Sequence, residues 1–445
     1  MRRLFTLLTL AGFLLMSESA FGQSRQIPAP AQSQPIIVHD AMIHPVGAAV
    51  IERGYVIFDE GRITAIGAMP LPREWRNREN VQRIDARDLH VYPGLIANNT
   101  QVGLQETSAV SVTVDHSERG EFTPEVRAAV AVNPDSELFP VARHNGILIG
   151  GVFPRGGLIS GHGSIMRFDG WTWEDMAIRS SAGLVINWPR TEPISARWMD
   201  QSESEQRRQI TERFQRIEDF FDEAEAYLAA REHDETLTID QRFEGMRAAL
   251  AGEQPVFFRA STIGQMQSAI AFAQRRGLTP IIVGGHDADR MADWLAERDV
   301  PVIIDGLHRL PRHRHDDFDR IYRLPQVLKK AGVRYCLASG AEPAHERFLN
   351  HNAATAAAYG LDADEALRAV TLSAAEILGI DQQYGSIETG KSATLIITTG
   401  NPLEITTDTL VAFIDGRRID LGNRQVAMFE KYREKYRQLG LLEEE

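Results

Sequence analysis

Two side-chain amides stand one residue apart, shortly after an apolar run near the start of the chain. The run covers residues 91–96, and Asn99 and Gln101 follow it. Because side chains alternate between the two faces of a strand, we expect both amides to point to the same side. Two histidines in this arrangement would chelate one divalent ion, whereas carboxamides are poor zinc ligands but good hydrogen-bonding groups. The pair therefore favours a polar binding site over a metal centre.

Eight apolar, β-rich runs fill the middle of the chain, with helical patterns between several of them. Runs that are apolar throughout are typical of parallel strands that are buried on both faces. We therefore predict an α/β fold in which these strands form a (β/α)8 barrel over residues 91–383. The residues just past each strand are then the candidate site, because barrel active sites lie at the C-terminal ends of the strands. The predicted strands are residues 91–96, 147–153, 164–168, 184–188, 256–260, 280–283, 302–304 and 334–338.

Shorter β-rich runs flank this region on both sides. We predict that residues 36–90 and 384–420 together form one small composite β-sandwich domain. Residues 421–445 are predicted to form a C-terminal helix and tail, with the helix near residues 424–438. We expect this basic, aromatic helix to pack against the body of the protein, and a partner-binding helix is the alternative.

The first residues combine a positive start, an apolar stretch and an exit of small residues. Arg2 and Arg3 precede the apolar run 4–16. This pattern predicts a signal peptide over residues 1–22, followed by a flexible lead-in over residues 23–35. A membrane anchor is the alternative, but the run is short for a spanning helix. We therefore expect an exported protein, periplasmic or extracellular, with no membrane span after the signal is removed.

Composition argues against one class of function and rules out an intramolecular disulfide. The formal net charge of the 445-residue chain is −13, which argues against non-specific binding to nucleic acid. The chain has one cysteine, Cys336, so it cannot form an intramolecular disulfide. Cys336 lies in the apolar run 335–338, where a buried and inert thiol is expected rather than a nucleophile.

Four segments carry a resemblance to a known superfamily. They are PGLI at residues 93–96, the helical block 353–378, GSIETGK at residues 385–391 and VAFIDGR at residues 411–417. These segments resemble the amidohydrolase superfamily, in particular its imidazolonepropionase-like and prolidase-like members with a composite β domain. The resemblance extends over most of the chain between residues 36 and 420 and implies the same fold as the strand pattern.

The resemblance also implies where metal ligands should fall, and this chain departs from that pattern. Members bind one or two divalent ions, usually zinc, through two histidines after strand one, a carboxylated lysine after strand four, histidines after strands five and six, and an aspartate after strand eight. Here Asn99 and Gln101 follow strand one, Arg259 takes the strand-five position, and Ala341 takes the strand-eight position. No lysine precedes Lys329. We therefore expect no metal cofactor.

The position after strand six is ambiguous between Gly284 and His286. His286 is the one histidine that could remain from the ligand set, and a single imidazole does not hold zinc. A role at the start of a helix is the alternative for His286. Metal-free hydrolysis would need a nucleophile with an adjacent base, or paired acids, and Ser339, His286 and Glu342 are candidates near the barrel mouth.

Two functions follow from these substitutions. The resemblance implies a hydrolase of non-peptide carbon–nitrogen bonds, acting on cyclic amides or small dipeptides. The substitutions favour instead a catalytically silent protein that binds a small acidic or amide-bearing molecule, or that partners an active amidohydrolase relative. The alternative is an active hydrolase with an altered or metal-free mechanism. The residues expected to contact the ligand are Asn99, Gln101, Arg259, His286, Ala341 and Glu342.

Overall fold

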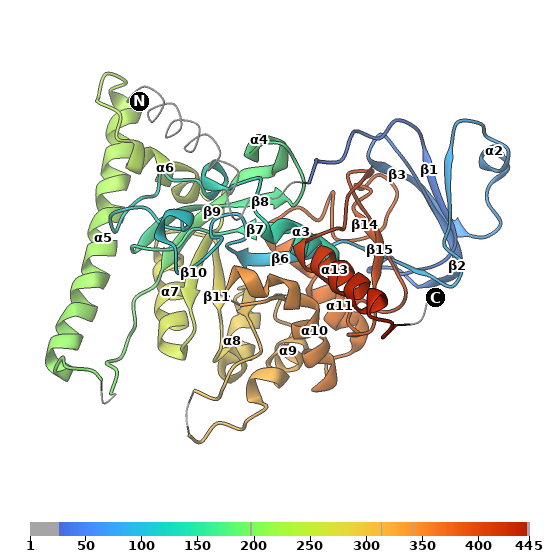
Figure 1. Cartoon of the computed structure of the whole chain (residues 1–445). Helices are drawn as coiled ribbons and strands as arrows, with labels where there is room; N and C mark the ends of the chain where they lie inside the picture. The colour runs from blue at the N-terminus through green and yellow to red at the C-terminus, as the bar shows by residue number, and fades with distance from the viewer. Residues whose placement is uncertain (1–25, 196–197, 313, 341, 443–445) are drawn as a thin grey trace, which may run out of the picture.

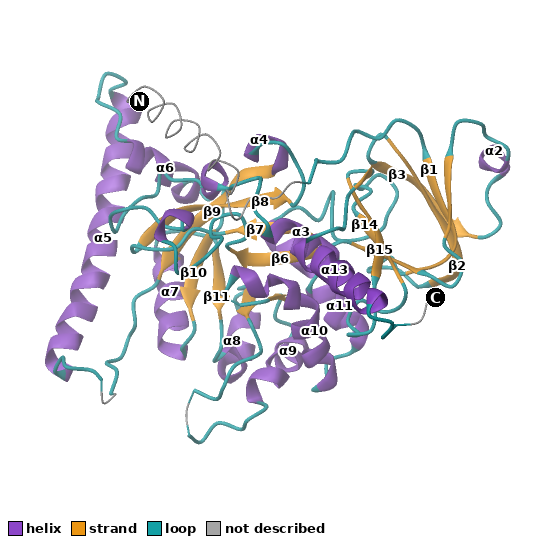
Figure 2. Cartoon of the chain, viewed as in Figure 1, coloured by secondary structure: helices purple, strands orange, loops and turns teal. Residues whose placement is uncertain are grey.

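The computed structural model describes residues 26–195, 198–312, 314–340 and 342–442. The predicted signal peptide and Ala341 lie outside these residues. The described chain forms two eight-stranded sheets. Most of its helices lie around one of these sheets, as Figures 1 and 2 show. This arrangement confirms the expected α/β barrel with a separate, smaller β domain.

The larger sheet is a nearly closed barrel. Its strands follow one another in the order β6 to β13, and β13 lies beside β6. A hydrogen bond crosses this seam, because the side-chain Nδ2 of Asn98 on β6 donates to Sγ of Cys336 on β13 across 2.8 Å. The strands are β6 (Leu95–Thr100), β7 (Ile147–Val152), β8 (Ile159–Arg167), β9 (Ala177–Asn187), β10 (Val256–Ala260), β11 (Pro280–Gly284), β12 (Val302–Asp305) and β13 (Tyr335–Ala338).

The barrel is not parallel throughout. Strand β8 runs antiparallel to both of its neighbours, β7 and β9, whereas every other pair in the sheet is parallel. The reason is the length of the connections. Only residues 153–158 join β7 to β8, and a parallel crossover needs about a dozen residues or more. The prediction of a uniformly parallel barrel is wrong at this strand.

The barrel encloses its own apolar core. Ile96, Val185, Phe257 and Ile303 are buried in one cluster that lines the interior. Ala374 and Leu378 of helix α12 (Leu372–Leu378) belong to the same cluster. Because Ile96 is near the start of its strand, α12 covers the N-terminal end of the barrel. The open mouth is therefore the end at which the strands finish.

Helices surround the outside of the barrel and bury a second, larger apolar cluster between themselves and the strands. Helix α7 begins at a complete capping box, in which Thr262 and Gln265 satisfy each other's backbone N–H groups. The long helix α5 runs along one side of the molecule, away from the small β domain (Figure 1). The longer helices are α3 (Leu138–His144), α5 (Glu203–His233), α6 (Gln241–Leu250), α7 (Ile263–Arg275), α9 (Arg320–Ala331), α10 (Leu349–Ala358) and α11 (Ala363–Ala369).

The small domain takes strands from both ends of the chain. Its order is β16-β15-β14-β5-β1-β2-β3, and β4 pairs with the first half of β1. The expected sandwich is thus one sheet that folds on itself, and the rings of Phe58 on β2 and Phe413 on β15 meet edge to face at 5.0 Å. The strands are β1 (Ile36–Ile43), β2 (Ile51–Asp59), β3 (Arg62–Ala68), β4 (Gln82–Asp85), β5 (His90–Pro93), β14 (Leu395–Thr398), β15 (Thr409–Ile414) and β16 (Arg417–Arg418).

The chain passes from the small domain to the barrel at Gly94. The run 91–96, predicted as one barrel strand, is divided there into β5 of the small sheet and β6 of the barrel. A Cβ atom at Gly94 would lie 2.7 Å from the side chain of Leu148 on β7, so only glycine fits this crossing.

The C-terminal helix α13 spans Arg424–Gln438, and none of its residues is buried. The expectation that this helix packs against the body of the protein is therefore wrong. Across the described residues, no helix has both the length and the apolar character that a membrane crossing requires.

Candidate functional site

The end of strand β6 is irregular, and this irregularity sets the directions of its side chains. Between Ala97 and Thr100, β6 holds one residue more than the paired stretch of β7. Asn99 has a left-handed φ of 53°, which asparagine adopts more readily than other side chains. Such a bulge interrupts the alternation of faces. Asn98 and Asn99 consequently both turn toward the barrel axis, where their hydrogen-bond partners lie.

Asn99 links a cation to an anion at the barrel mouth. Its Oδ1 accepts a hydrogen bond of 2.9 Å from Nη2 of Arg259, and its Nδ2 donates one of 3.1 Å to Oδ1 of Asp305. Nη1 of Arg259 also lies 3.5 Å from Oδ1 of Asn187 at the end of β9. A carboxamide can accept and donate at once, which histidine in its neutral form can do only through opposite ring nitrogens. We call the linked side chains Arg259, Asn99 and Asp305 the mouth triad.

The environment of Arg259 disfavours the charged form of its guanidinium. Burial and the charge of Arg155 together lower the pKa of its guanidinium to about 9, although the charge of Asp305 opposes both effects. Arg259 therefore remains charged at neutral pH but has lost much of the hydration that an exposed guanidinium keeps. A desolvated cation of this kind interacts strongly with an anion that reaches it.

Gln101 is buried but turned toward the backbone. Its Nε2 lies 3.4 Å from the carbonyl oxygen of Asn99 and 3.5 Å from that of Phe153. These long contacts hold the Gln101 amide against the backbone at Asn99 and at Phe153. Gln101 therefore supports the bulge at Asn99 and does not bond to Arg259.

His286 belongs to the mouth, although it lies outside any strand. Strand β11 ends at Gly284, and the ring of His286 reaches across so that Nε2 lies 3.1 Å from the carbonyl oxygen of Asp305. Because a carbonyl only accepts, Nε2 carries the hydrogen. Burial, followed by the charge of Arg309, lowers the pKa of His286. The ring is thus a neutral group that positions the end of β12.

The segment after β13 contributes fewer side chains to the barrel mouth than the sequence predicts. Ala341 lies outside the described residues, and Glu342 is exposed. Nε2 of Gln105 lies 3.5 Å from Oε1 of Glu342, a weak contact. Burial lowers the pKa of the Arg155 guanidinium, and the nearby charges of Asp305 and Glu342 oppose this effect.

A buried acid that the sequence did not suggest stands beside this segment. Glu346 is 2% exposed, and burial raises the pKa of its carboxyl to about 7. The hydroxyls of Thr100 and Ser339 oppose this rise, and the charge of Asp305 adds to it. Oε1 of Glu346 has no hydrogen-bond partner among the described atoms. The side chain is therefore poised between its protonated and ionised forms near neutral pH.

Asp305 and Glu346 were both missed in the sequence, for different reasons. Asp305 ends β12, and a carboxylate at a strand end was a usable signal, but the superfamily pattern places no ligand after strand seven. Glu346 lies in the short 3-10 segment Pro343–Phe348, where an acidic residue is normally exposed. No local pattern distinguishes it from a surface glutamate.

A cleft of about 1090 Å³ opens beside the mouth triad. His286 and Arg309 line it, and both bond to Asp305, so the cleft adjoins the triad. Its outer wall is apolar, because Leu310 is 88% exposed and Phe318 is 69% exposed. The charged residues of the lining are Arg190, Glu192, Asp287, Arg290, Arg309, Arg312, Asp316, Asp317 and Arg320.

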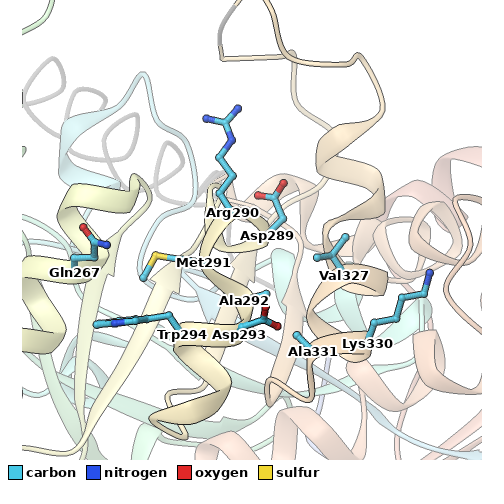
Figure 3. A pocket seen from close by; sticks show the side chains of 10 residues that line it. All are labelled: Gln267, Asp289, Arg290, Met291, Ala292, Asp293, Trp294, Val327, Lys330 and Ala331. Carbon is cyan, nitrogen blue, oxygen red and sulfur yellow. The ribbon is translucent and has the colours of Figure 1, made fainter.

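A second hollow lies on the outside of the barrel. This groove has a volume of about 560 Å³. Figure 3 shows its lining side chains, with Trp294 and Lys330 on opposite sides. Its residues come from α7, from the turn and helix α8 (Ala292–Glu297) that follow β11, and from α9. Asp293 and Lys330 give it both signs of charge. None of the described residues that line this groove bonds to the mouth triad, whereas His286 and Arg309 of the larger cleft both bond to Asp305. We therefore assign the candidate site to the cleft at the barrel mouth.

Among the residues that the structure describes, the one group of three acidic or imidazole side chains with metal-binding proximity lies in the small domain. It consists of His39, Asp40 and Asp85. Nε of Arg53 donates to Oδ1 of Asp40 across 2.6 Å, so a cation already neutralises this carboxylate. The group lies on the small sheet, whereas the mouth triad lies on the barrel sheet.

Comparison with known proteins agrees with this architecture. The model of the Amidohydrolase family matches residues 321–422. An imidazolonepropionase from Sphingopyxis alaskensis is 39% identical over 143 residues, which are 30% of this chain and 33% of that protein. An imidazolonepropionase from Rhizorhabdus wittichii is 30% identical over 156 residues, 34% of this chain and 37% of that protein. The chain thus matches only about a third of the length of these curated relatives.

Solved structures extend the likeness to nearly the whole fold. An amidohydrolase from Thermotoga maritima superposes with a TM-score of 0.76 at 21% identity, over 86% of this chain and 99% of that one. A prolidase in complex with N-methylphosphonate-L-proline gives a TM-score of 0.52 at 18% identity, over 87% of this chain and all of that one. Together with the family match over residues 321–422, these findings support membership of the amidohydrolase superfamily.

Proposed function

We propose that the barrel mouth binds a small acidic or amide-bearing molecule and does not hydrolyse it by the metal chemistry of the superfamily. The observation that carries this proposal is the hydrogen bond of 2.9 Å between Arg259 and Asn99. It sets a guanidinium at the strand-five position, where relatives are expected to offer a histidine to a cation. A guanidinium repels a divalent ion and attracts a carboxylate.

The other side chains of the mouth support this proposal. A zinc site needs three or four nitrogen, sulfur or oxygen ligands that converge on one point. Asn99 offers a carboxamide, Gln101 faces backbone carbonyls, and the Nε2 of His286 is engaged with the carbonyl of Asp305. These residues do not fit a zinc ion, so we derive no step through one.

A ligand screen tests the binding half of the proposal. The melting temperature of the purified protein is measured with a panel of small carboxylates, amides and neutral alcohols of matched size. We expect carboxylates or amides to raise it and Arg259→Ala to abolish the shift. Arg334→Ala is the matched control, because Arg334 pairs with Asp299 on the outside of the barrel. An Arg259→Ala protein that keeps every hit would remove the basis of the proposal.

A panel of enzyme substrates tests the second part of the proposal, that the protein does not hydrolyse its ligand by the metal chemistry of the superfamily. Cyclic amides and dipeptides are offered to the protein with added zinc or manganese, and we expect no turnover above the buffer. Metal-dependent hydrolysis that disappears in a variant of the mouth residues would contradict the proposal.

One observation favours a second candidate, an active hydrolase with a metal-free mechanism. Glu346 combines a pKa of about 7 with a position near the carboxylate of Asp305. Two carboxyl groups of unequal acidity can act as a general acid and a general base. This candidate requires turnover without added metal, lost in Glu346→Gln and kept in Glu342→Gln, which alters an exposed carboxylate instead.

A further inference from the structure

Interactions within its own segment stabilise the C-terminal helix α13. Asn423 caps it, and its Oδ1 accepts a hydrogen bond of 2.9 Å from the backbone of Val426. Pairs of opposite charge one turn apart, Arg433 with Glu430 and Arg437 with Glu434, support it further. Yet a helix of 15 residues is marginal in water unless one face is packed. The stability of α13 therefore depends on what covers one of its faces.

Large apolar and aromatic side chains of α13 and of the residue after it face solvent. Phe429 is 62% exposed and Leu439, which follows the last turn, is 59% exposed. Met428, Tyr432 and Tyr436 are exposed as well. With about 100° between successive residues, these five side chains fall within one arc of about 100°. They form a continuous stripe, which we call the apolar face of α13.

The charges of α13 are sorted around this face. Lys435, Arg424 and Lys431 lie along one border of the apolar face, and Arg433 and Arg437 lie beyond the other border. The two acidic residues, Glu430 and Glu434, lie on the opposite side of the helix. Five basic and two acidic residues give the helix a net charge of +3, in a chain whose net charge is −13.

This distribution selects one occupant. Lysine and arginine beside an apolar face extend their aliphatic stems along it and place their charges at the level of lipid headgroups. An amphipathic helix with basic borders and aromatic and leucine side chains is the kind that lies in a membrane interface. A second copy of the helix would instead bring like charges together, because both borders are basic.

We propose that α13 docks the protein onto an anionic lipid surface, with Phe429, Tyr432, Tyr436 and Leu439 inserted between headgroups and the flanking basic residues paired with lipid phosphates. The helix lies in the interface and does not cross it. The barrel mouth has no part in this contact, so the inference is independent of the proposed ligand.

Vesicle binding tests the proposal. The full chain without residues 1–22 is sedimented with vesicles of phosphatidylcholine alone and with vesicles that contain increasing fractions of phosphatidylglycerol. We expect binding to rise at least tenfold with the anionic lipid and to weaken as salt is added. Binding that is absent at every lipid composition, or equal on both lipids, would overturn the proposal.

Variants of the helix separate the lipid from other occupants. Phe429→Ser with Tyr432→Ser should lower vesicle binding at least tenfold, and Ala427→Ser on the opposite side should leave it within twofold. Neither change should alter the melting temperature of the body, because no residue of α13 is buried. Removal of residues 443–445, three glutamates, should strengthen binding because it removes negative charge. If the double variant instead converts a lipid-free dimer into a monomer, as measured by sedimentation velocity, the apolar face is covered by a second copy and the proposal is wrong.

Discussion

The amide of Asn99 separates the guanidinium of Arg259 from the carboxylate of Asp305, accepting a hydrogen bond of 2.9 Å from the first and donating one of 3.1 Å to the second. A direct ion pair would neutralise Arg259 and leave little attraction for a ligand. The intervening amide satisfies both groups and keeps their charges apart. The mouth triad therefore presents a cation that is fixed in position and still able to attract an anion.

The left-handed backbone conformation of Asn99 should affect the stability of the protein as well as its side chain does. Asn99→Gly and Asn99→Ala both remove the two hydrogen bonds, but only alanine is strained at a φ of 53°. We expect Asn99→Ala to be less stable than Asn99→Gly by about 1 kcal/mol. Urea unfolding of the two variants measures this difference. Equal stabilities would show that the bulge does not persist in solution.

Replacement of Arg259 should separate stability from binding. Burial and the charge of Arg155 lower the pKa of Arg259 to about 9, so its charged form is disfavoured in the fold. We expect Arg259→Met to melt at the same temperature as the unmodified protein or higher, while losing the affinity for acidic ligands. A melting temperature lowered by more than about 5 °C would mean that Arg259 serves mainly to hold the fold together.

Glu346 should make the protein less stable as the pH rises. Its folded-state pKa is raised from 4.5 to about 7, so the folded state holds this proton more tightly than the unfolded state does. The free energy of unfolding should therefore fall between about pH 4.5 and pH 7, by an amount on the order of 3 kcal/mol. Unfolding of Glu346→Gln over the same range isolates the effect, because the variant lacks this slope. Parallel pH profiles for the two proteins would exclude a buried, titrating Glu346.

His286 should produce the opposite slope. Its pKa is lowered, mainly by burial, so the folded state resists protonation of the ring. The stability that depends on a neutral His286 is present above the unfolded-state pKa of about 6.5 and is lost as the pH falls below it. His286→Gln should flatten this loss, which nuclear magnetic resonance titration of the ring can verify directly. A ring that titrates at or above pH 6.5 would contradict the burial of His286 at the end of β12.

The alternation rule predicted the site only in part. It correctly placed polar groups at the end of the first barrel strand, but it assigned Asn99 and Gln101 to the same face. The bulge before Thr100 changes this arrangement, because Asn99 joins Arg259 while Gln101 turns to the backbone. A bulge depends on how β6 pairs with β7, so no pattern within β6 alone reveals it.

The sequence predicted the fold more completely than it predicted the site. Apolar runs and the superfamily motifs led to the barrel and to the domain formed from both chain ends. The reversed strand β8 was also predictable from the six residues 153–158, which are too few for a crossover helix. Asp305 and Glu346, in contrast, acquire their significance from neighbours distant in sequence, Asn99 for the first and Thr100 for the second.

The metal content of the protein tests the central claim most directly. The chain is produced with ample zinc, purified without chelators and dialysed, and its zinc is counted by mass spectrometry, with His39→Ala, Asn99→Ala and His286→Gln variants measured in parallel. The account predicts much less than one zinc ion per chain in the unmodified protein. About one ion per chain that persists in His39→Ala and is lost on substitution of Asn99 or His286 would place a cation at the barrel mouth and contradict the account.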